Sequence, residues 1–294
     1  MKLKDYLNPD RQIQLMSFPY HFGLISNFFK LDVYQALVEQ FKQWIANAQP
    51  LGKIGDHNDL FYKAFCTTPS LKSMFEWPQN IFLSDQLQNY LCGFFSEKHH
   101  ANQYIILGAH QHKPPSETSW KHTDFNIVSF RKNNKRDSGY LDLWQPTDCI
   151  YTDDTEDKQK NTVKVCRYIA CIYYLNNPEW KIENGGETGI YSGYMNDIPL
   201  IAKVPPINNS LFFFEINPLS FHSAQGTREE RNSLIWWYHT SPAYQYFRHQ
   251  KLISYKEKYF NAEHFEYWCN KEKIRWQITQ DPSFEKFEKI YENA

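Results

Sequence analysis

Three residues of this sequence form a pattern that could hold a metal ion. His122 and Asp124 are separated by one residue, and His222 follows much later in the chain. Residues two apart in a strand share one face, so His122 and Asp124 can bind one ion together if they lie in a strand. Two imidazoles and one carboxylate occupy one face of an octahedron and leave three positions open, which is typical of non-haem Fe(II) oxygenases. The spacing therefore predicts an iron site at His122, Asp124 and His222.

A second group of residues could bind an anionic ligand. Arg231 and Ser233 share one strand face and offer a guanidinium and a hydroxyl, which together suit a carboxylate. If residues 227–230 turn the chain, Arg231 lies about 13 Å along the strand from His222. A five-carbon diacid that chelates the metal at one end could then reach Arg231 with the other end.

The sequence also contains a rival metal site. His110, His112 and Glu117 have the spacing of the metal ligands in cupins, another class of jelly-roll metalloprotein. Pro114 and Pro115 interrupt the strand that would have to carry these ligands, and proline is excluded from central strands. We therefore expect His110 and His112 in a surface loop, with the cupin site as the alternative.

Composition narrows the class of protein and its partners. The chain has 294 residues, 17% of them aromatic, and a net charge of −1. Contacts to phosphates require clustered Lys and Arg, so this charge argues against a nucleic-acid partner. No apolar run approaches the ~20 residues of a membrane helix, and the first ten residues lack an apolar stretch of the signal-peptide type. We expect a folded cytoplasmic protein with no membrane and no nucleic-acid partner; its oligomeric state stays open.

The periodicity of apolar residues changes twice and divides the chain into three parts. Residues 1–100 have mostly helical spacing, with predicted helix caps at Asp32 and Ser84. Residues 101–241 contain many short strands bounded by turns, which suggests a β-sandwich or jelly roll. Residues 242–294 return to helical spacing and predict a packed cap. The expected fold is mainly β with flanking helices (α+β) in one compact domain.

One long segment interrupts the predicted strands. Residues 131–161 are polar and charged, and at about 30 residues they are much longer than an ordinary loop. The segment directly follows the predicted strand that carries His122 and Asp124, so its ends are expected near the open side of the metal. It is predicted to be a mobile insertion that controls substrate entry; the alternative is a surface insertion without a role.

Several motifs follow one another in a specific order. They are His122–Asp124, Tyr173–Asn176 leading to Gly185–Glu187, Asn209–Phe214 ahead of Phe221–His222, and Arg231–Ser233. Together they resemble the 2-oxoglutarate- and Fe(II)-dependent dioxygenases of the prolyl-hydroxylase type, over roughly residues 101–240. The resemblance implies a double-stranded β-helix (jelly-roll) core.

The same resemblance implies roles for individual residues. Iron would be held by His122, Asp124 and His222, and the far carboxylate of 2-oxoglutarate by Arg231. Ser233 would assist Arg231, and so would Tyr104 on the strand ahead of His122.

The implied activity is hydroxylation of a C–H bond in an amino-acid-like substrate, free or peptidyl, with O2 consumed and succinate and CO2 released. Asp124 favours hydroxylation, because halogenating relatives lack this carboxylate. The insertion 131–161 and a stretched segment 109–119 depart from the family pattern. Both border the expected substrate entrance, so the identity of the substrate cannot be taken over from the family. A non-catalytic binding module with the same barrel is the second function class.

Overall fold

Two β-sheets and three α-helices make up the part of the chain that the computed structural model describes, which is residues 2–50, 64–67, 76–95, 101, 104–119, 121–125, 127–131, 142–143, 149–150, 162–193 and 198–259. The larger sheet has eleven strands, and nearly all of its pairs are antiparallel. Its main path runs through β1 (Gln12–Met16), β2 (Phe22–Ser26), β12 (Ser210–Glu215), β9 (Thr162–Tyr174), β14 (Arg231–Thr240), β5 (Tyr104–His112), β4 (Ala64–Thr67) and β3 (Gln49–Pro50). Beside this path lie β6 (Ile127–Arg131), β7 (Asp142–Leu143) and β8 (Cys149–Ile150).

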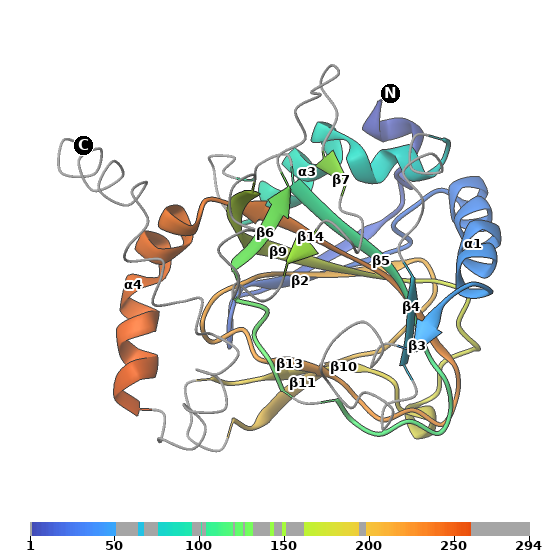
Figure 1. The fold of residues 1–294 in the computed structure, drawn as a ribbon. Helices are drawn as coiled ribbons and strands as arrows, with labels where there is room; N and C mark the ends of the chain where they lie inside the picture. The colour runs from blue at the N-terminus through green and yellow to red at the C-terminus, as the bar shows by residue number, and fades with distance from the viewer. Residues whose placement is uncertain are drawn as a thin grey trace.

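The smaller sheet faces the larger one and closes the barrel (Figure 1). Its strand order is β11 (Leu200–Val204), β10 (Thr188–Tyr191) and β13 (His222–Ala224). The core between the sheets takes Tyr174 and Phe212 from the larger sheet and Ile190 and Val204 from the smaller one. Two facing antiparallel sheets around one core form a jelly roll. The predicted mainly β fold with a jelly-roll core is confirmed.

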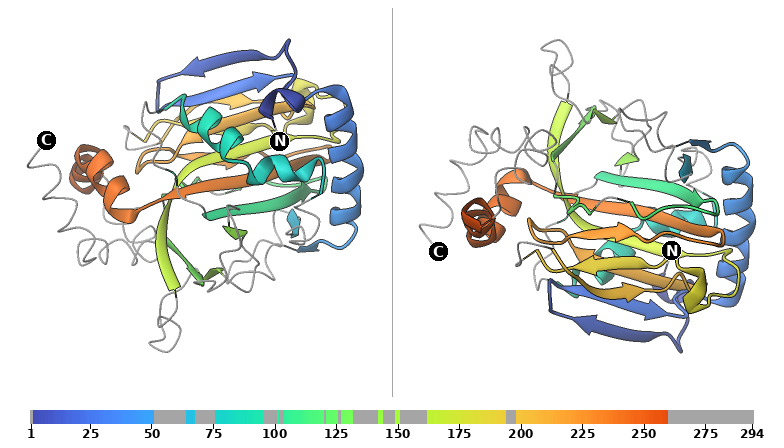
Figure 2. Two further views of the ribbon diagram at one scale, coloured as in Figure 1. Left: turned by 90° about the horizontal axis from the view of Figure 1, so that it is seen from above. Right: turned by 90° about the horizontal axis from the view of Figure 1, so that it is seen from below.

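A second core covers the outer face of the larger sheet. Helix α1 (Leu31–Ile45) buries Val33, Leu37 and Phe41, which lie four residues apart and therefore on one helix face. Helix α3 (Asp85–Cys92) buries Leu87, which belongs to the same cluster as Trp236 of β14. Figure 2 shows α3 lying across this face of the sheet. The helices thus stabilise the sheet from the side opposite the barrel interior.

The N-terminal region contains strands as well as helices, so the prediction of a mostly helical region over 1–100 was incomplete. Strand β2 pairs with β12, where Phe22 lies opposite Phe214, and β1 pairs with β2 at the edge of the sheet. The sequence of β1, Gln-Ile-Gln-Leu-Met, alternates polar and apolar residues. This period of two is the signal for a strand that the helical interpretation passed over.

The two predicted helix caps have different outcomes. Ser84 caps α3, because its Oγ accepts a hydrogen bond of 3.1 Å from the backbone N of Leu87. The cap predicted at Asp32 is wrong, since α1 begins at Leu31 and its N-cap residue is Lys30. Asp32 instead lies in the first turn, where a carboxylate interacts favourably with the helix dipole.

Helix α4 (Pro242–Tyr259) is the described part of the predicted C-terminal cap. The side-chain amide of Gln245 donates hydrogen bonds to the backbone O of Arg167 at 2.7 Å and of Ile216 at 3.1 Å. Arg248 forms an ion pair with Glu215 at the end of β12. These polar contacts attach α4 to the sheet; residues 260–294 lie outside the described residues.

The predicted insertion 131–161 is described in small part. Strand β7 pairs with β5 and strand β8 pairs with β6, so two short pieces of it join the larger sheet. The rest of the segment lies outside the described residues, and its predicted role in substrate entry stays a prediction. Among the described helices, none is both long and apolar enough to cross a membrane.

The α3 cap gives a direct test of this local analysis. Replacing Ser84→Ala removes the acceptor for the Leu87 N–H and should lower the free energy of unfolding by about 0.5–2 kcal/mol. Asp32→Ala is the matched control, and it should cost at most about 1 kcal/mol because it removes a dipole interaction alone. Urea unfolding followed by tryptophan fluorescence measures both; an equal or larger loss for Asp32→Ala would contradict the assignment of the caps.

Candidate functional site

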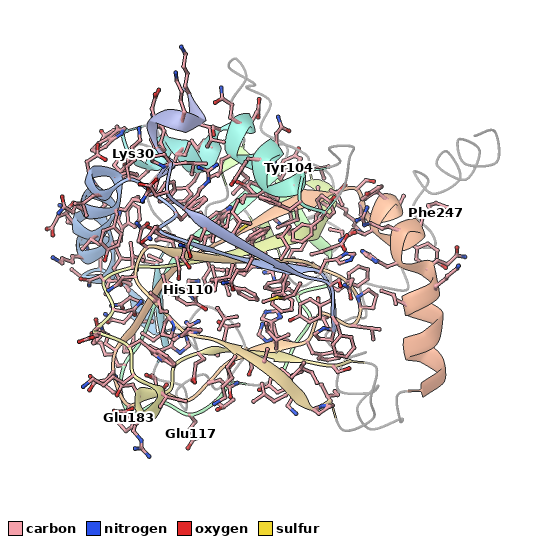
Figure 3. All side chains as sticks on the ribbon, turned by 180° about the vertical axis from the view of Figure 1, so that it is seen from behind. Lys30, Tyr104, His110, Glu117, Glu183 and Phe247 are labelled. Atoms are coloured by element: carbon pink, nitrogen blue, oxygen red, sulfur yellow. The ribbon has the colours of Figure 1, made fainter. Side chains whose placement is uncertain are left out.

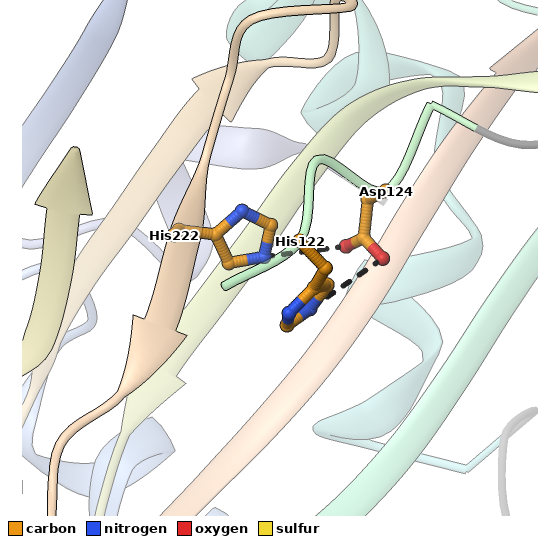
Figure 4. Close-up of side chains that lie close together, drawn as sticks. All are labelled: His122, Asp124 and His222. Atoms are coloured by element: carbon orange, nitrogen blue, oxygen red, sulfur yellow. Dashed lines mark ion pairs between the residues drawn. The ribbon is translucent and has the colours of Figure 1, made fainter. Parts of the chain in front are cut away.

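His122, Asp124 and His222 lie close together in the structure. One ligand atom from each lies within 4.8 Å of the others. Figure 4 shows the three side chains close together, with the carboxylate of Asp124 beside the two imidazole rings. The Nε2 atom of His122 is 3.9 Å from Asp124 Oδ1, and the Nε2 atom of His222 is 3.6 Å from Asp124 Oδ2. The His122 side chain is 29% exposed, against 6% for His222 and 8% for Asp124, so the cluster opens toward solvent on the His122 side.

The backbone brings the three side chains together in a way that differs from the predicted regular strand. His122 and His222 form an isolated antiparallel bridge, with N–O distances of 3.0 and 2.9 Å in the two directions. Asp124 has a φ of 59°, a left-handed conformation that Asp tolerates better than most residues. The carboxylate therefore reaches the imidazoles through a sharp change in chain direction after the bridge and not through strand alternation.

The Asp124 carboxylate is held from both sides. Arg167 pairs with its Oδ1, and the indole Nε1 of Trp237 donates to its Oδ2 at 2.7 Å. Burial alone would raise the pKa of Asp124, but Arg167 and the two histidines lower it well below its usual value. The carboxylate is thus ionised and fixed in orientation, as a metal ligand must be.

The imidazole of His222 is oriented by its second nitrogen. Its Nδ1 donates to the backbone O of Ser220 at 3.0 Å, which leaves Nε2 directed toward Asp124. A histidine that binds a metal commonly donates its other ring nitrogen in this manner. Two imidazoles and one ionised carboxylate with converging ligand atoms match the donor set of a divalent iron site.

Arg231 lies buried in the barrel, 2% exposed. Its Nε donates to the backbone O of Gly186 at 2.8 Å, and its Nη2 donates to Thr188 Oγ1 at 3.1 Å. The hydroxyl of Tyr174 is 2.6 Å from the same Thr188 oxygen, and the guanidinium carbon lies 5.3 Å from the Tyr174 ring centre. Among the described residues, no carboxylate forms an ion pair with this guanidinium. A buried positive charge in this situation suits an anionic ligand.

The turn at Gly185 and Gly186 makes this arrangement possible. Both residues have positive φ, 70° and 78°, and a Cβ at Gly185 would lie 2.2 Å from the carbonyl oxygen of Gly226. Glycine is therefore required there, and the turn directs the carbonyl of Gly186 toward Arg231.

The structure corrects the expected position of two histidines. His110 and His112 are not in a surface loop, because β5 continues through His112 and Pro114 follows the end of the strand. His112 lies opposite Arg231 and His110 lies opposite Ser233, on the strand face that lines the barrel interior. Pro114 does not interrupt the strand, because it follows His112, the last residue of β5 that pairs with β14.

The cupin alternative is not supported. Glu117 is an exposed residue, and Figure 3 shows it at the surface while His110 lies between the two sheets. Among the described residues, the one group that could hold a metal ion is His122, Asp124 and His222.

The expected role of Tyr104 also needs correction. Tyr104 begins β5, whereas Arg231 pairs with His112 at the other end of that strand, about 27 Å away along the backbone. The tyrosine beside Arg231 is Tyr174 instead. Ser233 does lie next to this group, buried on β14 and opposite Tyr174.

Two residues of the site, Arg167 and Trp237, were missed as functional residues from the sequence. Arg167 is a charged residue inside the apolar run 165–175, and this buried charge is the signal that could have identified it. Trp237 belongs to the aromatic run Trp236–Tyr238, and nothing in that run distinguishes it as a site residue. Its contact with Asp124 depends on a fold contact between distant segments, which spacing alone does not reveal.

Residues 140–239 match the sequence model of the 2OG-Fe(II) oxygenase superfamily. The match covers about a third of the chain, and over that region the chain is similar to this superfamily. The matched region contains His222 and Arg231, and the geometry above adds His122 and Asp124 from outside it. Both the matched region and the ligand cluster are therefore similar to those of oxygenases that use Fe(II) and 2-oxoglutarate.

Similar proteins include prolyl hydroxylases. Over 80 residues the chain is 36% identical to prolyl 3-hydroxylase OGFOD1 of Xenopus laevis, a match that covers 25% of this chain and 15% of that protein. Among solved structures, a Pseudomonas putida prolyl-4-hydroxylase is 13% identical with a TM-score of 0.44, covering 74% of this chain and 92% of that one. A Trichoplax adhaerens prolyl hydroxylase, solved with a hypoxia-inducible-factor peptide, is 15% identical with a TM-score of 0.45, covering 74% and 83%.

The metal cluster can be tested by removing one ligand. His222→Ala should weaken binding of Fe(II) or Mn(II) by more than about a hundredfold, because loss of an outer contact to a metal ligand alone costs about 10- to 100-fold. Glu117→Ala is the control and should leave metal affinity unchanged. Anaerobic calorimetric titration measures the metal affinity of both variants. An affinity that depends on Glu117 but not on His222 would show that the metal binds at the cupin-type site instead.

Three histidines, two of them buried and His110 half-buried, make stability depend on pH. Burial lowers the pKa of His110 to about 4, of His239 to about 3 and of His249 to about 4. In the unfolded chain these imidazoles take up protons below about pH 6.5, so the unfolded state binds more protons there than the folded state. Stability is therefore full above that pH and falls between pH 7 and pH 5, by about 2 kcal/mol for each histidine.

The measurement is urea unfolding of the metal-free protein at pH 8, 7 and 5. The values at pH 8 and 7 serve as the reference and should agree closely. An equal free energy of unfolding at pH 7 and pH 5 would mean that these imidazoles are not held neutral in the folded protein.

Proposed function

We propose that this protein is an Fe(II)- and 2-oxoglutarate-dependent oxygenase, a hydroxylase that acts on a C–H bond of an amino-acid-like substrate, free or peptidyl and similar to the substrates of prolyl hydroxylases. When bound, Fe(II) and 2-oxoglutarate supply the oxidising chemistry that uses O2 to form the hydroxyl group, with succinate and CO2 as the other products. The observation that carries the proposal is a buried Arg231 without an acidic partner among the described residues, in the same barrel as the His122, Asp124 and His222 cluster.

The residues around the cluster support iron binding by His122, Asp124 and His222. Arg167 keeps Asp124 ionised, and the Ser220 carbonyl orients His222. Three protein ligands leave three coordination positions open, which allows a chelating cosubstrate and O2 to bind together. The presence of Asp124 favours hydroxylation, as expected from the sequence.

Arg231 supports binding of the far carboxylate of 2-oxoglutarate. Its guanidinium is fixed by Gly186 and Thr188, so little side-chain entropy is lost when a carboxylate binds. The hydroxyls of Tyr174 and Ser233 on neighbouring strands provide further donors. The exposed side of His122 is the side from which substrate would approach, and a cytoplasmic location stays the expectation from the sequence.

A non-catalytic binding module is the competing function. It would keep the barrel but would not turn over 2-oxoglutarate. The deciding experiment is an anaerobic reconstitution with Fe(II), followed by exposure to O2 and measurement of succinate across a library of free amino acids and prolyl peptides. Substrate-dependent succinate formation with stoichiometric hydroxylated product supports the hydroxylase; Fe(II) and 2-oxoglutarate binding without succinate would support the module.

Arg231 provides the sharpest prediction for the cosubstrate. Arg231→Leu removes a charge-assisted contact of roughly 1.5–3 kcal/mol, so the affinity for 2-oxoglutarate should fall about ten- to a hundredfold. Metal affinity should persist, because Arg231 is no ligand. Arg228→Leu, at an exposed arginine three residues earlier, is the matched control and should bind normally. Calorimetry with Mn(II)-loaded protein tests this, and unchanged 2-oxoglutarate binding in Arg231→Leu would refute the assignment of the carboxylate site.

A further inference from the structure

Three neighbouring strands present one polar row to the barrel interior. Ser233 of β14 lies directly opposite His110 of β5 on one side and opposite Tyr174 of β9 on the other. Arg231 and His112 form the adjacent pair, two residues further along the same strands. Because Arg231 reaches back to within 5.3 Å of the Tyr174 ring centre, its guanidinium belongs to the same region as this row.

The ring of His110 is turned along its own strand, over Gly108. A Cβ at Gly108 would lie 2.9 Å from His110 Nε2, so a side chain at that position would displace the ring. Gly108 lies opposite Ile235, which is two residues closer along β14 to Trp237 and its contact with Asp124. The imidazole is therefore situated between the Arg231 end of the barrel and the Asp124 end.

The charges at both ends act on this imidazole. Burial, followed by Arg231, lowers the pKa of His110, Asp124 opposes this effect, and the resulting pKa is about 4. At neutral pH the ring carries no charge and offers one N–H donor and one nitrogen acceptor.

The polar groups of the row are short of partners within the protein. The Oγ atom of Ser233 is fully buried and has no hydrogen-bond partner. Among the described residues, no hydrogen bond involves a ring nitrogen of His110. A buried donor without an acceptor is costly, so the Ser233 hydroxyl points to an acceptor that a ligand supplies, and the half-buried His110 ring on the residue opposite offers a second donor beside it.

We propose that His110 is a specificity-determining residue for the cosubstrate, which together with Ser233 donates a hydrogen bond to the far carboxylate of 2-oxoglutarate beside Arg231. This inference rests on the proposed function, since it names a further contact in that cosubstrate site. A neutral imidazole adds a donor without a second positive charge next to Arg231. Gly108 is part of the arrangement, because it leaves the space in which the ring lies.

The test compares ligands that do and do not possess a far carboxylate. Mn(II)-loaded protein is titrated anaerobically with 2-oxoglutarate and with oxalate, which can chelate the metal but is too short to reach Arg231. His110→Ala should weaken 2-oxoglutarate binding about ten- to a hundredfold and leave oxalate binding unchanged. Gly108→Ala should also weaken 2-oxoglutarate binding selectively, although it keeps the imidazole, because it displaces the ring.

Two further variants separate binding from folding. Gln111→Ala changes the neighbouring residue on the opposite strand face and should bind both ligands normally. His110→Asn keeps a side-chain donor and should recover part of the lost 2-oxoglutarate affinity. If His110→Ala fails to fold, Gly108→Ala and His110→Asn still decide the question.

The possible results distinguish this inference from the proposed function. If His110→Ala binds 2-oxoglutarate with wild-type affinity while Arg231→Leu binds it more weakly, the role of His110 is overturned and the proposed function stands. Equal loss of 2-oxoglutarate and oxalate binding would also overturn it, because the effect would then come from the metal site or the fold. A wild-type protein that binds metal and oxalate but not 2-oxoglutarate would overturn the proposed function as well.

Discussion

The central strand β14 is buried on both faces, and the two faces differ in chemistry. Leu234, Trp236 and Tyr238 point to the outer core beneath the helices, while Arg231, Ser233 and Trp237 point into the barrel. Strand alternation links the two sets, so a shift of one residue would exchange them. Pairing with β5 on one side and β9 on the other fixes this register. The polar interior is thus tolerated because the same strand is anchored by an apolar core on its other face.

Buried charge is the second constraint on this barrel. Arg167 and Asp124 form a buried ion pair, and Trp237 contacts both partners: it donates to the carboxylate and lies 4.3 Å from the guanidinium carbon. Such a pair gains little stability, because removing two charges from water costs about as much as their attraction returns. What it provides is a fixed, ionised carboxylate. Function therefore explains this pair better than stability does.

Much of the site could be predicted from the sequence, and the failures have physical reasons. The spacing of His122, Asp124 and His222 identified the cluster, although Asp124 reaches it through a left-handed residue and not through a regular strand. His110 was predicted in a loop because Pro114 and Pro115 were expected to prevent a strand at the residues before them. The strand in fact continues to His112 and ends before the prolines. The jelly roll could be read from the series of short strands. The Arg167 and Trp237 contacts with Asp124 could not, since they depend on which distant strands become neighbours.

The charge balance of the barrel indicates why the histidines beside Arg231 must be neutral. With a divalent ion bound, Arg167, Arg231 and the ion together outweigh the single negative charge of Asp124. A dicarboxylate compensates this excess at two points, one at the ion and one at Arg231. Protonation of His110 or His112 would add a further positive charge close to Arg231, and burial together with Arg231 lowers the pKa of both imidazoles. Under the proposed function, this distribution of charge suits a dianion, because a monocarboxylate bound at the ion would leave Arg231 buried without a counterion.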